Sequence, residues 1–204
     1  MGADAGAVLA ALKRDVKHQT GVLPKNHVIL TQQAGFSGDS ALWGHIAMVG
    51  TETTVLVGTT KGAFLLRGGN TRTGWKVEGP FCDGAPVNHV VGDPKTGLLW
   101  AGGGGDFHGA TIWRSTDNGA SWIATRLTKG MVDDWAANDA DFAKQVGWKD
   151  EPLPFGDDFK QIWSLHYANG ILYAGTKPAR LLASKDGGIT WEKVNGLTDH
   201  PSAD

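Results

Sequence analysis

Three side chains that could take part in acid–base chemistry lie in short polar or glycine-rich stretches of this 204-residue chain. Asp106 and His108 are two residues apart, so the carboxylate could orient the imidazole as a general acid or base. The alternative for this pair is a flexible exposed loop without catalytic function. Asp83 is the third catalytic candidate, since glycoside hydrolysis uses two carboxylates, although no spacing in the sequence singles out one pair.

No stretch has the pattern of a metal or cofactor site. The single cysteine, Cys82, has no Cys/His spacing around it that suggests zinc. The glycine run 102–105 is followed neither by a helix nor by Lys-Ser/Thr, as a phosphate-binding loop would be. We therefore expect no metal and no cofactor. The thiol has no evident base beside it and is expected to be inert.

Composition and charge exclude several classes of protein. Hydrophobic residues make up 41% of the chain and charged residues 20%, which fits neither a disordered chain nor a coiled coil. The net charge of -2 gives no general attraction to nucleic acid or to an anionic membrane. No apolar run approaches the roughly 18 residues of a membrane span. The N-terminal apolar stretch has its positive charges after it, the reverse of a signal peptide, so a cytoplasmic protein is expected.

The glycine and tryptophan content points to short strands and tight turns. There are 30 Gly residues, about twice the usual share of about 7%, and nine Trp residues. Part of this excess belongs to an internal repeat, S-x-D-x-G-x-[S/T]-W, found at 115–122 and 184–191. The upstream segments 97–102 (GLLWAG) and 170–175 (GILYAG) match as well. A third copy, at 54–75, keeps the strand pattern and loses the turn pattern.

The spacing of the repeats predicts β-propeller blades. The repeat tryptophans are Trp75, Trp122 and Trp191, with spacings of 47 and 69 residues. The first spacing is close to the roughly 40–50 residues of a four-stranded blade. The second is longer by 22, which indicates an insertion at 130–158 with a local charge of -6. We expect a helix over 133–146, with Trp135, Phe142 and Val146 near one face.

Each repeat can be divided into four short strands, A to D. The middle repeat has them at 87–91, 98–101, 111–114 and 122–126, and the last at 162–166, 171–174, 181–184 and from 191 onward. The predicted fold is therefore all-β, an incomplete propeller of about three four-stranded blades over 47–204. Residues 1–46 form an unassigned N-terminal extension, in which 7–18 could be a helix and 21–43 has a weak strand pattern.

The S-x-D-x-G-x-[S/T]-W pattern resembles the Asp-box, or BNR repeat, of sialidase-like β-propellers. The wider pattern is similar to bacterial exo-sialidase-like proteins, with VGTTKGAF at 57–64, GPF at 79–81 and YAGTKPARL at 173–181. The resemblance covers roughly 54–204. It implies that the repeat is a structural turn between strands C and D. Eight residues would then be framework rather than catalytic groups: Ser115, Asp117, Gly119, Trp122, Ser184, Asp186, Gly188 and Trp191.

The strand order places the loops on two faces. The A–B and C–D turns share one face, and the B–C and D–A connections share the other, which we call the loop face. The resemblance implies that a ligand site lies on the loop face. The candidates for ligand binding there are Lys61, His89, Phe107, His108, Trp163, Lys177 and Arg180.

Two functional interpretations stay open. A sialidase mechanism asks for three arginines on a carboxylate, an Asp acid/base and a Tyr nucleophile with a Glu, and neither the Arg triad nor the Tyr/Glu pair is visible. A binding or scaffold propeller needs only a shaped face with aromatic and charged groups, and its ligand could be a carbohydrate or a protein. The alternative is a glycoside hydrolase of exo-sialidase or xyloglucanase type whose remaining catalytic residues lie outside this chain.

Three blades do not close a ring. Closed propellers need at least four blades, and three leave two exposed sheet edges. We therefore expect that further blades or a second chain complete the propeller, so that these 204 residues are a partial chain.

Overall fold

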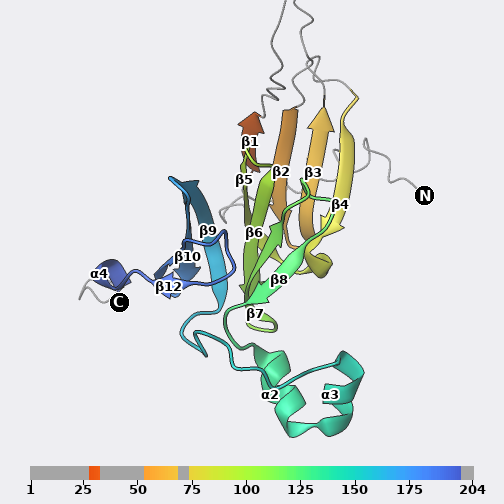
Figure 1. Ribbon diagram of the computed structural model, residues 1–204. Helices are drawn as coiled ribbons and strands as arrows, with labels where there is room; N and C mark the ends of the chain where they lie inside the picture. Colours follow the sequence, from red (N-terminus) through yellow and green to blue (C-terminus); the bar gives the residue numbers. More distant parts are fainter. Residues whose placement is uncertain (1–27, 33–52, 69–73, 199–204) are drawn as a thin grey trace, which may run out of the picture.

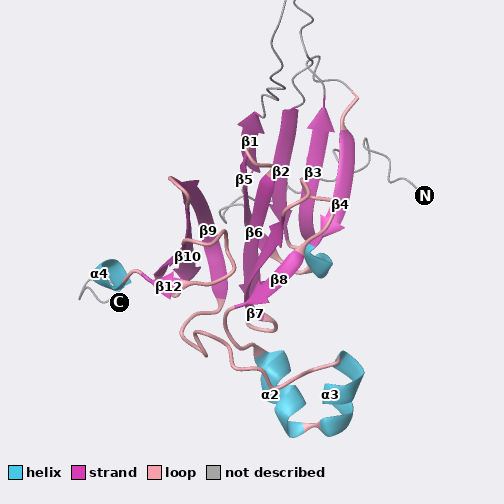
Figure 2. Ribbon diagram, viewed as in Figure 1, coloured by secondary structure: helices cyan, strands magenta, loops and turns pink. Residues whose placement is uncertain are grey.

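The computed structural model describes residues 28–32, 53–68 and 74–198. The strands in these ranges, β1 to β12, pair into three antiparallel blades (Figures 1 and 2). Blade 1 consists of β1 (Val28–Gln32), β2 (Thr53–Thr59), β3 (Gly62–Gly68) and β4 (Lys76–Phe81). Blade 2 consists of β5 (Val87–Asp93), β6 (Leu98–Gly105), β7 (Gly109–Ser115) and β8 (Ile123–Arg126). Blade 3 consists of β9 (Gln161–Ala168), β10 (Ile171–Lys177), β11 (Leu181–Ser184) and β12 (Glu192–Lys193).

Within each blade the strands pair in chain order, as strands A to D of a propeller blade do. This confirms the predicted all-β fold: the chain is an incomplete β-propeller, with three blades in the part that the structure describes. A single pairing of Gly104 with Gln161 joins β6 to β9, so the second strand of blade 2 meets the inner strand of blade 3 at one point.

One strand of blade 1 lies inside the N-terminal range that the sequence pattern left unassigned. β1 pairs with β2 over five residues, from Val28 opposite Val57 to Gln32 opposite Thr53. It takes the place of strand A in blade 1. The helix expected at 7–18 lies outside the described residues.

Two apolar interfaces hold the blades together. Between blades 1 and 2, Leu56, Leu65 and Val87 are among the buried residues, with Trp113 and Cys82 beside them. Between blades 2 and 3 the buried residues include the following large side chains: Trp100, Ile112, Leu127, Phe159, Ile162, Leu165 and Leu172. Most of the hydrophobic stabilisation therefore arises between blades, where each sheet covers its neighbour.

How deeply the strands of a blade are buried depends on whether the blade has a neighbouring blade on one face or on both. β6 and β7 of blade 2 are buried almost continuously, because this blade has a neighbour on both faces. β10 of blade 3 alternates between buried and half-buried residues, with Leu172, Ala174 and Thr176 buried. Blade 3 thus has one face on blade 2, and its other face is less covered.

The acidic insertion forms two short helices instead of the one helix expected over 133–146. α2 (Met131–Asn138) and α3 (Ala140–Val146) are separated by Asp139, whose backbone is extended. The Asp139 carboxylate accepts hydrogen bonds from the backbone N–H groups of Asp141 and Phe142, at 3.0 and 2.9 Å. This residue caps α3 and stops α2, because a capping side chain competes with helical continuation.

The connections are sorted between two faces. The β6–β7 loop and the insertion after β8 leave the same ends of the strands, and in Figure 1 α2 and α3 lie beyond the ends of β7 and β8. The short helix η1 (Cys82–Gly84) connects β4 to β5 on this loop face, while α4 (Asn195–Thr198) follows β12. The turns between β5 and β6 and between β7 and β8 lie on the opposite face, which we call the turn face.

We expect Trp100→Ala to lower the free energy of unfolding by about 3–5 kcal/mol, since a fully buried tryptophan is removed from the interface of blades 2 and 3. Urea denaturation monitored by circular dichroism measures the loss. The matched control is Trp163→Ala in β9, where the tryptophan is 44% exposed, and it should cost less than half as much. Equal losses from the two variants would contradict this account of blade packing.

Candidate functional site

The two repeat turns, 115–122 and 184–191, are bonded in the same way. In the first, Ser115 Oγ donates to Asp117 Oδ1 at 2.8 Å and accepts from the Gly119 N–H at 2.8 Å. The backbone N–H of Ser121 donates to Asp117 Oδ1 at 2.9 Å, and its hydroxyl donates to Oδ2 at 2.5 Å. Trp122 Nε1 donates to Gly119 O at 3.1 Å. The carboxylate is thus bonded to its own turn.

The second turn repeats these bonds. Ser184 Oγ donates to Asp186 Oδ1 at 2.8 Å and accepts from the Gly188 N–H at 2.8 Å. Thr190 donates its N–H to Asp186 Oδ1 at 2.9 Å and its hydroxyl to Oδ2 at 2.5 Å. Trp191 Nε1 donates to Gly188 O at 3.2 Å. Side-chain and backbone donors hold the pKa of Asp186 well below its usual range, and the corresponding donors lower that of Asp117 to about 2.

The loop face carries a row of aromatic rings that comes from two separate segments. Phe107, in the β6–β7 loop, contacts the His108 ring edge-on at 4.6 Å between centroids and the Trp135 ring of α2 at 5.5 Å. Trp135 also contacts Phe142 of α3, at 6.2 Å. Phe107, Met131 and Trp135 are 40%, 44% and 49% exposed. We call this surface the aromatic patch, and its members are Phe107, His108, Met131, Trp135 and Phe142.

A buried carboxylate fixes the insertion to blade 2. Asp133 accepts hydrogen bonds from the Arg126 guanidinium, from the Gly130 N–H at 2.8 Å and from Trp148 Nε1 at 2.9 Å. Burial favours the neutral acid, but the three donors outweigh it and lower the pKa of Asp133. Arg126 lies on β8, so this carboxylate connects the last strand of blade 2 to the start of the insertion and to Trp148, which follows α3.

The backbone attaches the insertion to the β6–β7 loop as well. The N–H groups of Met131 and Val132 donate to the carbonyls of Asp106 and Phe107, at 2.8 and 3.0 Å. At Gly130 the segments are so close that a Cβ would lie 2.4 Å from Phe107 O. The aromatic patch is therefore built on a rigid support.

The remaining ligand-binding candidates lie in different places. Lys61 is exposed in the β2–β3 turn. Lys177 Nζ lies 5.3 Å from the centre of the Trp163 ring, a cation–π contact at the junction of β9 and β10. Arg180 forms an ion pair with Asp158 at 3.4 Å. The structure therefore brings together Phe107 with His108, and Trp163 with Lys177.

His89 connects the inner strands of blades 2 and 3. Its Nδ1 accepts a hydrogen bond from the Leu165 N–H at 2.8 Å, and the neighbouring Asn88 donates to Ile162 O at 2.9 Å. Both bonds cross from β5 to β9. An imidazole that accepts through Nδ1 carries its proton on Nε2 when it is neutral.

Of the catalytic candidates, Asp83 is exposed in η1, and Asp106 is exposed at the end of the aromatic patch. His108 is exposed too and contacts the Phe107 ring edge-on. Cys82 is buried, and burial raises the pKa of its thiol to about 12. Within the described ranges, no three His, Cys, Asp or Glu side chains gather in a way that could hold a metal ion. Nor does any helix in those ranges have the length and apolar character needed to cross a membrane.

Two residues of this surface and its support are not indicated by the sequence pattern. Met131 was not expected in the patch, because a single methionine beside a glycine gives no periodic signal. In the sequence Asp133 is one of the acids that give the insertion its charge of -6, yet in the structure it is 6% exposed. The available signal was the pairing of an acid with Gly three residues before it, at a helix N-terminus.

Comparison with known proteins finds similarity of fold among solved structures. No family model matches the chain, and no curated protein matches it. Among solved structures it is similar to YCF48 bound to D1 peptide, with 16% identity and a TM-score of 0.41 over 69% of this chain and 36% of that one. The chain spans about a third of the length of that protein. At this identity and TM-score the likeness adds nothing on function, and the resemblance to sialidase-like propellers stays a prediction.

The lowered pKa values of Asp117 and Asp186 predict a pH dependence of stability. A carboxyl group whose pKa is lower in the folded protein than in the unfolded chain stabilises the fold. This stabilisation is complete at pH values above the unfolded pKa of 3.8, and it is lost as the pH falls toward about 2. The double variant Asp117→Asn/Asp186→Asn should be less stable than the parent at pH 7. The difference should shrink between pH 4 and pH 2 in thermal melts, and a constant difference over that range would contradict the role given to the two carboxylates.

We expect Asp133→Asn to loosen the insertion without unfolding the blades, because the neutral amide loses the charged bond to Arg126. Hydrogen exchange followed by mass spectrometry should show faster exchange in α2 and α3 and unchanged exchange in β6 and β7. Asp134→Asn changes the neighbouring exposed acid and serves as the control, with parental exchange expected throughout. Parental exchange of α2 in Asp133→Asn would show that other contacts hold the insertion.

Proposed function

We propose that the chain is a binding propeller that holds a polypeptide ligand against the aromatic patch on its loop face. The observation that carries this proposal is the patch itself, in which Phe107, Met131 and Trp135 are each 40% exposed or more. Contiguous exposed apolar side chains on a soluble fold are typical of interaction sites. Tryptophan and phenylalanine rings contribute large contact areas at a small entropic cost.

The rigidity of the patch supports the same proposal. Asp133, Arg126 and Trp148 hold α2 against blade 2, and two backbone hydrogen bonds hold it to the loop that carries Phe107. Rings that are already ordered lose little conformational freedom when a ligand binds. A loop without such support would lose conformational freedom when the ligand binds, and this loss would weaken the affinity.

Charge around the patch indicates the class of ligand. The following exposed carboxylates lie in the β6–β7 loop and on the insertion: Asp106, Asp134, Asp139 and Asp141. Lys144 is an exposed base on the same insertion, so acids predominate. A segment with lysines or arginines around an apolar anchor residue complements this surface in both respects. The ligand proposed is therefore a basic polypeptide segment with one aromatic or aliphatic anchor.

Binding of a fluorescent basic peptide with a central leucine or tryptophan tests the proposal by fluorescence anisotropy. Affinity for the parent should exceed that of an acidic peptide with the same anchor by at least tenfold, and it should fall as salt is raised. Trp135→Ala should weaken binding by about tenfold or more, as expected of a tryptophan hot spot.

The matched control is Ile189→Ala, which removes an exposed apolar side chain of the 184–191 turn and should leave affinity unchanged. Equal binding of the basic and acidic peptides would overturn the basic class of ligand. Binding unaffected by Trp135→Ala would overturn the site. An oligosaccharide panel is run in parallel, and sugar binding that needs Trp135, without peptide binding, would replace the polypeptide by a carbohydrate.

A further inference from the structure

Three asparagines of this chain are followed by glycine, at 118–119, 169–170 and 195–196. Asparagine is one of the thermally labile residues of proteins, and it is most labile before glycine. The glycine nitrogen, which no side chain obstructs, attacks the asparagine side-chain carbonyl carbon, and a five-membered succinimide forms. The first two dipeptides lie in exposed turns, and the structure gives them opposite surroundings.

Ring closure requires a particular backbone angle at the asparagine. The side-chain carbon comes within reach of the next nitrogen when ψ of the asparagine is about −120°, the value at the first central residue of a type II′ turn. In a type I′ turn, where ψ is about +30°, the side chain is directed away from that nitrogen. An asparagine at this position of a type I′ turn must therefore rotate the peptide group that follows it before it can react.

The turn between β9 and β10 can make this rotation within its hairpin. Ala168 pairs with Ile171, so the turn has two central residues, Asn169 and Gly170. Their φ angles of 51° and 80° are those of type I′. Types I′ and II′ are the two turns that two-residue hairpins favour, and they differ by a flip of the central peptide group. The flip brings ψ of Asn169 to the reactive value while both strands stay in place.

No contact in the described part of the chain opposes the flip. Asn169 and Gly170 are both exposed. Within the described ranges, neither the Asn169 carbonyl nor the Gly170 N–H forms a hydrogen bond. A Cβ on Gly170 would meet no atom within 4 Å apart from its chain neighbours. Figure 2 shows this turn at the end of blade 3 that is directed away from α2 and α3, which is the turn face.

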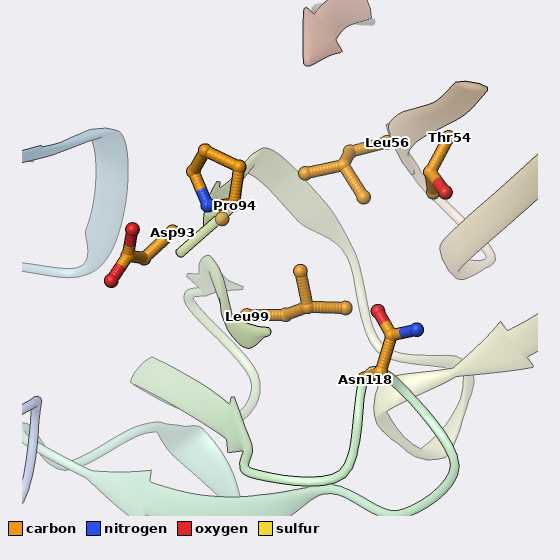
Figure 3. Close-up of a pocket in the computed structure, with 7 residues that line it drawn as sticks. Thr54, Leu56, Asp93, Pro94, Leu99 and Asn118 are labelled. Atoms are coloured by element: carbon orange, nitrogen blue, oxygen red, sulfur yellow. The ribbon is translucent and has the colours of Figure 1, made fainter. Parts of the chain in front are cut away.

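The same dipeptide in the first repeat turn is held on both sides of its peptide group. The Asn118 carbonyl accepts a hydrogen bond from the Arg67 guanidinium, and the Gly119 N–H donates to Ser115 Oγ at 2.8 Å. Gly119 is also buried. Figure 3 shows Asn118 beside Leu99, among the residues at the junction of blades 1 and 2. A flip of this peptide group would break both hydrogen bonds.

The local conformation does not distinguish the two sites. The φ angle is 57° at Asn118 and 51° at Asn169, and glycine follows in both. The difference lies in contacts with residues elsewhere in the chain. The third dipeptide begins α4, where the helical backbone differs from that of both turns. The matched comparison is therefore between Asn118 and Asn169.

We propose that Asn169 is a deamidation site of the folded protein and that the contacts of Asn118 protect it. The Gly170 nitrogen forms a bond to Asn169 Cγ, and the side-chain amide nitrogen leaves as ammonia with the proton of the Gly170 N–H. One water molecule then opens the succinimide to aspartate or isoaspartate. The net change is asparagine plus water to an acid plus ammonia, so no oxidant or reductant takes part.

The modification changes the hairpin that carries it. Both products place a negative charge at the tip of the turn, and isoaspartate makes the backbone one carbon longer. A two-residue turn is specified by its length, so the extra atom is incompatible with type I′ geometry. The pairing of Ala168 with Ile171 should therefore loosen in the isoaspartate form. The site is independent of the aromatic patch, because it lies on the turn face.

Incubation of the full chain at mildly alkaline pH, followed by peptide mass spectrometry, tests the proposal. In the folded protein Asn169 should deamidate at least tenfold faster than Asn118. In urea the two rates should agree within about threefold, because both sites then have the reactivity of the dipeptide alone. Isoaspartate is identified by labelling with a protein isoaspartyl methyltransferase. Equal rates at the two sites of the folded chain, or no product at Asn169, would overturn the proposal.

Variants separate the two parts of the proposal. Asn169→Gly keeps a hairpin-compatible turn, and hydrogen exchange at Ile171 should then be the same before and after incubation, whereas it should become faster in the incubated parent. Ser115→Ala frees the Gly119 N–H and should raise the rate at Asn118 at least fivefold. Arg67→Gln removes the other bond and should act in the same direction, which keeps the test open if one variant does not fold. An unchanged rate at Asn118 in either folded variant would show that these bonds do not protect it.

Discussion

The packing of one blade face on the next is the constraint on which the rest of this structure depends. No blade buries its apolar residues alone, since an isolated antiparallel sheet has two faces and little core. Blade 2 meets this requirement on both faces, and its strands β6 and β7 are accordingly buried almost throughout. The repeat turns contribute to the same contacts, because Gly119 approaches Leu65 of blade 1 and Gly188 approaches Trp100 of blade 2.

Each repeat turn combines a local function with a long-range one. Asp117 and Asp186 satisfy the N–H groups of their own turns and leave one backbone carbonyl directed at the preceding blade. That carbonyl is bound by Arg67 at one junction and by Trp100 at the other. The same backbone geometry thus accepts hydrogen bonds from different side chains at the two junctions.

The loop face follows a different principle. There the 130–158 insertion is attached by one buried carboxylate together with backbone hydrogen bonds to the β6–β7 loop, and the arrangement of the rings of the aromatic patch depends on these attachments. A buried ion pair is costly to form and more costly to break, so it specifies position more than it adds stability. Asp133 with Arg126 serves in this way, because it fixes where α2 lies and hence which way Trp135 faces.

Much of the fold could be predicted from the sequence, because its signals are local. Alternating apolar residues, turn glycines and a repeated turn pattern recur within each blade, and every strand of blades 2 and 3 was expected within a few residues of its observed place. The insertion was expected as one helix, but the extended backbone at Asp139 divides it. That outcome depends on a capping bond that the hydrophobic periodicity does not report.

The amino-acid sequence by itself determined the strands, their order in each blade and the bonding within each repeat turn, since these depend on residues close together in the chain. Only the tertiary structure decided which side chains meet across blades. Arg67 reaches a carbonyl 51 residues away, and Trp100 reaches one 87 residues away. The burial of Asp133 and the meeting of Phe107 with Trp135 likewise need the insertion to fold back onto blade 2. Such contacts depend on how the sheets pack, and a pattern with a period of two residues carries no information about them.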